Sequence, residues 1–94
     1  MISDHQKQIV RQLLRPLAPY KVGVFGSYAR GDHHAESDLD ILLFVDGTVK
    51  FSLLDLIGIE QRLSDALGVT VDLVLDRSLN PLIRPYVERD LQFI

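Results

Sequence analysis

The 94-residue sequence contains no cysteine and no tryptophan, and its apolar runs are too short to cross a membrane. Without cysteine, disulfides and thiolate metal sites are excluded, and we expect a cytoplasmic protein. The first residues also lack the basic and apolar regions of a signal peptide. Positive charge is scarce, since 10 Lys and Arg stand against 13 Asp and Glu. This balance argues against direct binding to nucleic acid, which needs a concentrated basic surface.

Length and apolar content predict one small domain, residues 1–94, with a modest core, because 47% of the residues are hydrophobic. We expect no second lobe that closes over a substrate. We therefore expect a partner chain to complete any site, in a hetero-oligomeric complex.

Hydrophobic periodicity predicts alternating helices and strands. Ser3, with Gln6 three positions later, is a candidate N-cap for the first helix. The predicted elements are a helix that Pro16 ends, strands over 21–25 and 38–45, a helix over 51–67, a strand over 69–75 and a last helix from Asn80.

Two of these helices have apolar residues at helical spacing, which predicts the sides that face the core. The predicted inward residues are Leu53, Leu54, Ile57, Leu63 and Leu67, then Leu82, Ile83, Tyr86, Val87 and Leu91. The charged runs over 60–62 and 88–90 are interpreted as solvated helix faces. The fold predicted is α/β (α+β), a small mixed β-sheet with helices mainly on one face and the strand over 38–45 inside it.

Asp38 and Asp40 stand at the start of the apolar strand over 38–45. Residues two apart in a strand point to the same face, so the two carboxylates repel each other. At an effective dielectric of about 20 this repulsion is on the order of several kcal/mol. A hard divalent cation, Mg²⁺ or Mn²⁺, would remove it. The alternative is that both are ordinary solvent-facing residues at a strand edge.

Asp72 interrupts the apolar strand over 69–75. A buried charge there is costly unless it meets a cation or several donors. If this strand lies beside the strand over 38–45, Asp72 completes a cluster of three carboxylates, a set that can hold two metal ions about 4 Å apart. The alternative is an exposed face of an edge strand.

Gly26 and Ser27 follow the strand over 21–25. A glycine lets phosphate oxygens approach the backbone, and the serine adds a hydroxyl and an N–H donor. A short helix from Tyr28 would add further N–H donors, and Arg30 could reach the same phosphates. The alternatives are a plain turn and a solvated arginine.

In residues 26–40, GSYARGDHHAESDLD, ten residues separate Gly-Ser from Asp-x-Asp. This spacing resembles the signature of the DNA polymerase beta-like nucleotidyltransferases. The Ala-Arg-Gly and Ser-Asp elements are similar to those of minimal nucleotidyltransferases, the MntA-type antitoxins paired with HEPN-domain toxins. The resemblance implies transfer of a nucleoside monophosphate from a triphosphate to a hydroxyl, with release of pyrophosphate.

The resemblance also implies roles for single residues. Asp38 and Asp40 would ligate two Mg²⁺ ions, with Mn²⁺ as an alternative metal. Asp72 would bind the catalytic metal and orient or deprotonate the acceptor hydroxyl. The candidate nucleotide-binding residues are Gly26, Ser27, Arg30 and Ser37.

In the MntA-like branch, AMP passes from ATP to a tyrosine of the cognate HEPN toxin, and the toxin is silenced. We expect the same reaction here. One alternative is a non-catalytic toxin-binding module of the same fold. Another is an enzyme that modifies a hydroxyl of a small molecule or of RNA.

Overall fold

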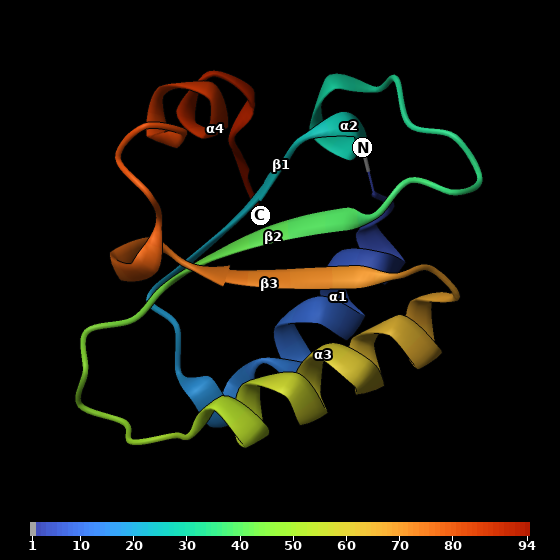
Figure 1. The fold of residues 1–94 in the computed structure, drawn as a ribbon. Coiled ribbons are helices and arrows are strands. Elements are labelled where there is room, and N and C mark those ends of the chain that lie inside the picture. The colour runs from blue at the N-terminus through green and yellow to red at the C-terminus, as the bar shows by residue number, and fades with distance from the viewer. Residues whose placement is uncertain (1) are drawn as a thin grey trace.

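The computed structural model describes residues 2–94, which form a four-stranded mixed sheet with helices on both faces (Figure 1). The sheet order is β3-β2-β1-β4, where β2 and β3 are parallel and β1 is antiparallel to both of its neighbours. The elements, with two 3₁₀ turns labelled η, are α1 (Asp4–Leu13), η1 (Arg15–Leu17), β1 (Lys21–Phe25), α2 (Ser27–Arg30), β2 (Leu39–Phe44), α3 (Leu53–Leu67), β3 (Val71–Leu75), η2 (Asp76–Ser78), α4 (Arg84–Asp90) and β4 (Gln92–Phe93).

Two layers of helix cover the sheet, and strand alternation decides which side chains meet each layer. Helices α1 and α3 lie along one face and α4 lies on the other (Figure 1), while α2 follows β1 and packs Ala29 into the core on the α1 and α3 side. In β2, Leu39, Ile41 and Leu43 are buried in the core on the α1 and α3 side. Leu42 points the opposite way and packs with Val87 of α4. The predicted fold class and the interior position of β2 are confirmed.

Local signals fix the ends of the long helices. Ser3 caps α1 in a capping box with Gln6, as predicted. Ser52 does the same for α3 through Asp55. Gly68 ends α3 in the left-handed conformation, with φ 70°. None of the helices within residues 2–94 has the length and apolar character that a membrane span requires.

The prediction of the α3 side that faces the core is confirmed at Leu63 and Leu67 but is wrong for the start of the helix. The packed residues recur at three- and four-residue spacing and are Leu56, Ile59, Leu63 and Leu67. Leu54 and Ile57 lie off this stripe and are 79% and 49% exposed. Leu53 begins the helix and is 71% exposed. Because α3 is apolar on more than one side, periodicity alone could not select the packed side.

The last helix begins at Arg84, later than predicted. Leu82 and Ile83 therefore precede it and are exposed, and Tyr86 is 62% exposed. Val87 is buried and Leu91 packs beside it, so this part of the prediction is confirmed. The two-residue strand β4 was not predicted, because it is too short to show a period.

Side chains of α3 cover the outer edge of β3. The hydroxyl Oγ of Ser64 accepts the N–H of Val71 at 2.9 Å, and Glu60 Oε2 accepts that of Leu73 at 2.8 Å. The interpretation of Glu60 as a solvated residue is wrong, because its carboxylate satisfies a strand N–H that would otherwise lack a partner. These bonds fix β3 so that Val71 and Leu73 face the core and Asp72, between them, faces the other side.

Candidate functional site

Asp40 and Asp72 are direct neighbours across the parallel pair β2 and β3. The residues flanking each of them point into the core under α1 and α3, so both carboxylates lie on the opposite face of the sheet. The condition set for Asp72, that β3 lies beside β2, is met. Asp38 lies two residues before Asp40, in the exposed segment that enters β2. The fold thus brings together carboxylates from two segments more than 30 residues apart in the chain.

Electrostatics single out Asp40. Burial, and after it the charges of Asp72 and Asp38, together raise the pKa of Asp40 from 3.8 to about 6. Arg30 opposes the shift. Asp40 is partly buried, whereas Asp38 and Asp72 are exposed. The repulsion expected between these aspartates is therefore present, and it falls on the most buried of them.

Across residues 2–94, no three Asp, Glu or His side chains are grouped in a geometry that would hold a metal ion. The donors nevertheless fit a hard divalent cation. Asp40 and Asp72 supply carboxylate oxygens from neighbouring strands, and a cation would offset the charge that raises the pKa of Asp40. Asp38 precedes the first residue of β2, so it differs from this pair in not being part of a strand.

The turn after β1 lies directly against Asp40. Gly26 has φ 74° and ψ −153°, a conformation that L side chains rarely adopt. A Cβ atom at Gly26 would also collide with Asp40 Oδ2. Any other residue at position 26 would be strained and would displace the Asp40 carboxylate. Helix α2 begins at Ser27, one residue earlier than anticipated, and is four residues long.

Arg30 ends α2 and is held by two carboxylates. Its Nε donates to Asp32 Oδ2 at 3.0 Å, and its Nη1 donates to Asp90 Oδ2 at 2.8 Å. The interpretation of Asp90 as a solvated residue is wrong, since its side chain is only 11% exposed. Sequence analysis missed this contact because 60 positions separate the partners. Ser37 accepts the N–H of His34 at 2.9 Å and so closes the loop before β2.

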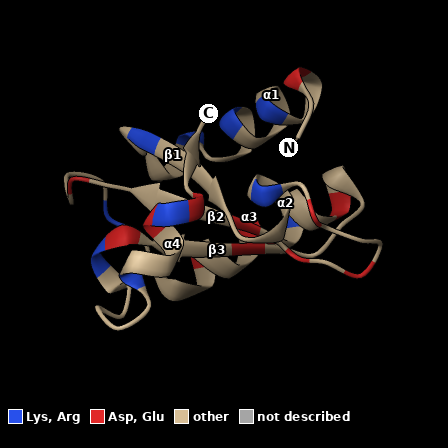
Figure 2. Ribbon diagram, turned by 90° about the horizontal axis from the view of Figure 1, so that it is seen from above, with Lys and Arg blue, Asp and Glu red and all other residues tan. Residues whose placement is uncertain are grey.

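Acidic segments gather around this end of the sheet. Figure 2 shows red segments along the loop that joins α2 to β2 and on β3, and a blue segment on α2. The site thus contains several carboxylates and one guanidinium beside a glycine turn. Such a combination suits a ligand that carries both phosphate groups and cations.

A family model described as a nucleotidyltransferase domain matches residues 4–94. The chain belongs to this nucleotidyltransferase family. The protein adenylyltransferase MntA of Thermococcus cleftensis is 43% identical over 94 residues, 100% of this chain and 89% of the relative. A Methanocaldococcus jannaschii protein, provisionally named a protein adenylyltransferase, is 43% identical over 93 residues, 94% of this chain and 93% of its own.

A crystal structure of a toxin–antitoxin pair with AMP-PNP has a similar fold, with a TM-score of 0.78 and 30% identity. The match covers 94% of this chain and 70% of the other. The resemblance drawn from residues 26–40 is thus confirmed at the level of the family. This nucleotidyltransferase places its Gly-Ser turn and its Asp-x-Asp segment against each other, because β1 and β2 are antiparallel and Phe25 pairs with Asp40.

Proposed function

We propose that this nucleotidyltransferase transfers AMP from ATP to a tyrosine hydroxyl of a cognate HEPN-type toxin and thereby acts as its antitoxin. The observation that carries the proposal is the pairing of Asp40 with Asp72 beside the Gly26 turn. The choice of AMP and of a protein acceptor is supported by the similarity to protein adenylyltransferase MntA. The fold's likeness to a toxin–antitoxin structure with AMP-PNP supports the antitoxin role.

Three aspartates of this chain would hold the metal. Asp38, Asp40 and Asp72 provide the hard oxygen ligands that suit two Mg²⁺ ions, and Mn²⁺ fits the same donors. When bound, Mg²⁺ supplies neutralisation of the phosphate charge. The raised pKa of Asp40 fits this assignment, because a carboxylate that is partly buried and also faces like charges gains most from a cation.

The remaining residues bind and orient the nucleotide and the acceptor. Gly26 and Ser27 would bind the terminal phosphates through backbone N–H groups and the hydroxyl. Arg30 would add a guanidinium contact, and Ser37 shapes the loop at the site's margin. Asp72 is exposed, so an acceptor from another protein can reach it.

In the proposed reaction, Asp72 orients the tyrosine hydroxyl and takes its proton. The hydroxyl oxygen forms a bond to the α-phosphorus, the bond from that phosphorus to the bridging β-oxygen breaks, and pyrophosphate leaves. Such a transfer needs mainly positioning and charge neutralisation from the protein. The acceptor is recognised largely through contacts with the partner, in a hetero-oligomeric complex in the cytoplasm, where ATP and Mg²⁺ are available.

The test is transfer of labelled AMP onto a cognate HEPN-type protein, with Mg²⁺ present. Asp38→Ala and Asp40→Ala should abolish labelling. Asp46→Ala is a matched control, because Asp46 lies in the turn after β2 and bonds Thr48. Full labelling by Asp38→Ala or by Asp40→Ala would exclude this mechanism.

A further inference from the structure

Asp90 lies at the C-terminal end of α4, where its carboxylate contacts α2. Arg30 Nη1 donates to Asp90 Oδ2 at 2.8 Å, and Arg89 Nε approaches Asp90 Oδ1 to 3.5 Å. The hydrogen bond from Arg30 lowers the pKa of Asp90, so the carboxylate is ionised at neutral pH. The side chain of Asp90 is 11% exposed, whereas that of Arg30 is 42% exposed. This ion pair is therefore better shielded from water than an ordinary surface pair.

Arg30 makes its other contact with Asp32, whose side chain is 61% exposed. The two contacts use two of the five N–H donors of the guanidinium, and the other three remain for a ligand within the described part of the chain. Arg30 lies one helical turn after Gly26 and close enough to Asp40 to lower its pKa. An oriented guanidinium with unused donors thus stands beside the carboxylates of the proposed site.

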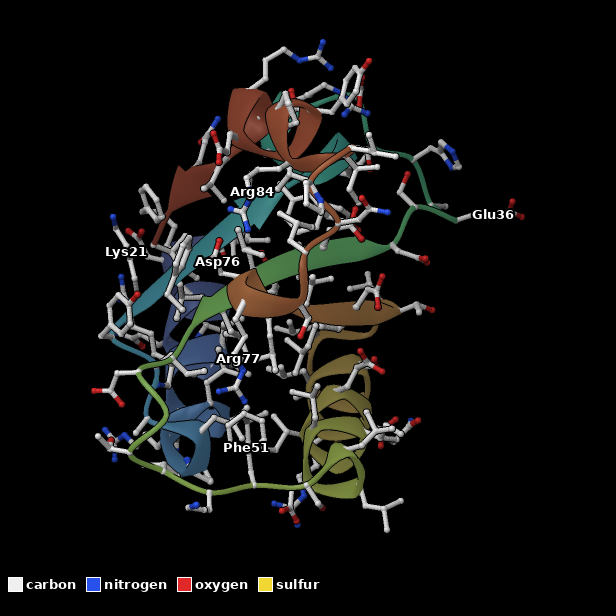
Figure 3. All side chains as sticks on the ribbon, turned by 60° about the vertical axis from the view of Figure 1, so that its left-hand side comes forward. Lys21, Glu36, Phe51, Asp76, Arg77 and Arg84 are labelled. Atoms are coloured by element: carbon white, nitrogen blue, oxygen red, sulfur yellow. The ribbon has the colours of Figure 1, made fainter. Side chains whose placement is uncertain are left out.

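Further bonds hold the same two segments together. Gln92 Nε2 donates to the carbonyl oxygen of Ala29 at 3.0 Å, and Gln92 pairs with Val24 where β4 joins β1. At the other end of α4, Arg84 and Asp76 point toward each other (Figure 3), and Arg84 Nη1 donates to Asp76 Oδ1 at 2.8 Å. The C-terminal segment is therefore tied down at both ends of α4, which keeps Asp90 fixed relative to α2.

We infer that Asp90 is a positioning residue for nucleotide binding, which acts by orienting Arg30 toward the triphosphate. The inference rests on the proposed function, and the group that touches the nucleotide is the guanidinium of Arg30. A guanidinium that is already oriented loses less side-chain freedom when it binds phosphate, so affinity is gained through preorganisation. Asp32 differs from Asp90 in that its carboxylate is 61% exposed, so water screens its contact with Arg30 more strongly.

The experiment measures binding of α,β-methylene ATP, which cannot donate AMP, to the full chain by calorimetry with Mg²⁺ present. Asp90→Asn should weaken binding about tenfold, a change of about 1.4 kcal/mol. Asp32→Asn, the matched control on the same guanidinium, should change it less than twofold. In the transfer assay, Asp90→Asn should raise KM for ATP more than it lowers kcat. Asp90→Glu, which keeps the charge, should restore part of the affinity.

A double-mutant cycle separates positioning from a general loss of structure. If Asp90 acts through Arg30, adding Asp90→Asn to Arg30→Ala should cost no further affinity. Equal losses from Asp90→Asn in both backgrounds, or unchanged affinity in the single variant, would overturn the inference while leaving the proposed function intact. If Asp90→Asn does not fold, an Asp90→Glu variant that binds no better than Arg30→Ala would overturn it as well. Absence of nucleotide binding by the wild type would overturn both.

Discussion

Replacing Asp40 with asparagine should make the metal-free protein more stable and abolish AMP transfer. The folded state raises the pKa of Asp40 from 3.8 to about 6, mainly by burial and then through Asp72 and Asp38. At neutral pH a shift of this size corresponds to about 3 kcal/mol against the charged form. Asp40 is only partly buried, and solvent screens the neighbouring charges, so we expect a gain of about 1–2 kcal/mol. For a domain of this length, each kcal/mol raises Tm by about 4–8 °C.

The sign of the pH dependence follows from the direction of the shift. Because the folded-state pKa of Asp40 is raised, the protonated side chain favours folding below pH 4, and this contribution is lost as pH rises through about 6. Asparagine has no charge to lose or gain. The stability advantage of Asp40→Asn should therefore be small at pH 4, grow between pH 4 and 6, and be complete at pH 7.

The assay is thermal unfolding in EDTA at pH 4.5, 5.5 and 7. Glu36→Gln serves as the control, because Glu36 lies in an exposed loop and points away from the fold (Figure 3), so its Tm should match the wild type. A Tm for Asp40→Asn no higher than the wild type at pH 7 would refute the reasoning. So would an advantage that grows as pH falls, because burial and like charge at Asp40 could not produce that trend.

Other consequences of the structure are open to direct measurement. Gly26→Ala should abolish nucleotide binding measured by calorimetry and lower the free energy of unfolding in urea by about 1–3 kcal/mol, because Gly26 has a φ of 74° and a Cβ atom there would collide with Asp40. Wild-type binding and stability would contradict this. Glu60→Ala should lower the free energy of unfolding in denaturant by about 1–2 kcal/mol, since it removes the acceptor of the Leu73 N–H in β3. An unchanged midpoint would mean that water replaces the Glu60 carboxylate as acceptor. Leu63→Ala should cost about 2–5 kcal/mol and Leu54→Ala less than about 0.5, and the reverse order would show that α3 packs on its other side.

The features that sequence predicted well are those set by neighbouring residues. Strand β1 has the bounds that its apolar run predicts, and the box of Ser3 and Gln6 starts α1 where expected. The pairing of Asp40 with Asp72 required one further assumption, that two strands linked by a helix lie side by side. Such a connection commonly joins adjacent parallel strands, so this part of the site could be foreseen.

The rest depended on packing that no local pattern encodes. Arg30 and Asp90 meet across 60 residues, and the local sequence around either residue gives no sign of the other. Glu60 was interpreted as solvated because nothing in the sequence shows that the β3 edge runs beside it. The exposed residues of α3 illustrate the same limit, since amphipathicity predicts that one side packs but cannot choose between two apolar sides.

The central claim is that Asp40 and Asp72 jointly hold the metal–nucleotide complex. Crystals of the wild-type chain grown with Mn²⁺ and α,β-methylene ATP, measured at a wavelength where manganese scatters anomalously, test it most directly. The account predicts an anomalous peak about 2.1 Å from carboxylate oxygens of both residues, with the terminal phosphates against Gly26 and Ser27. Nucleotide and manganese bound together elsewhere on the chain, with both carboxylates lacking metal, would contradict it.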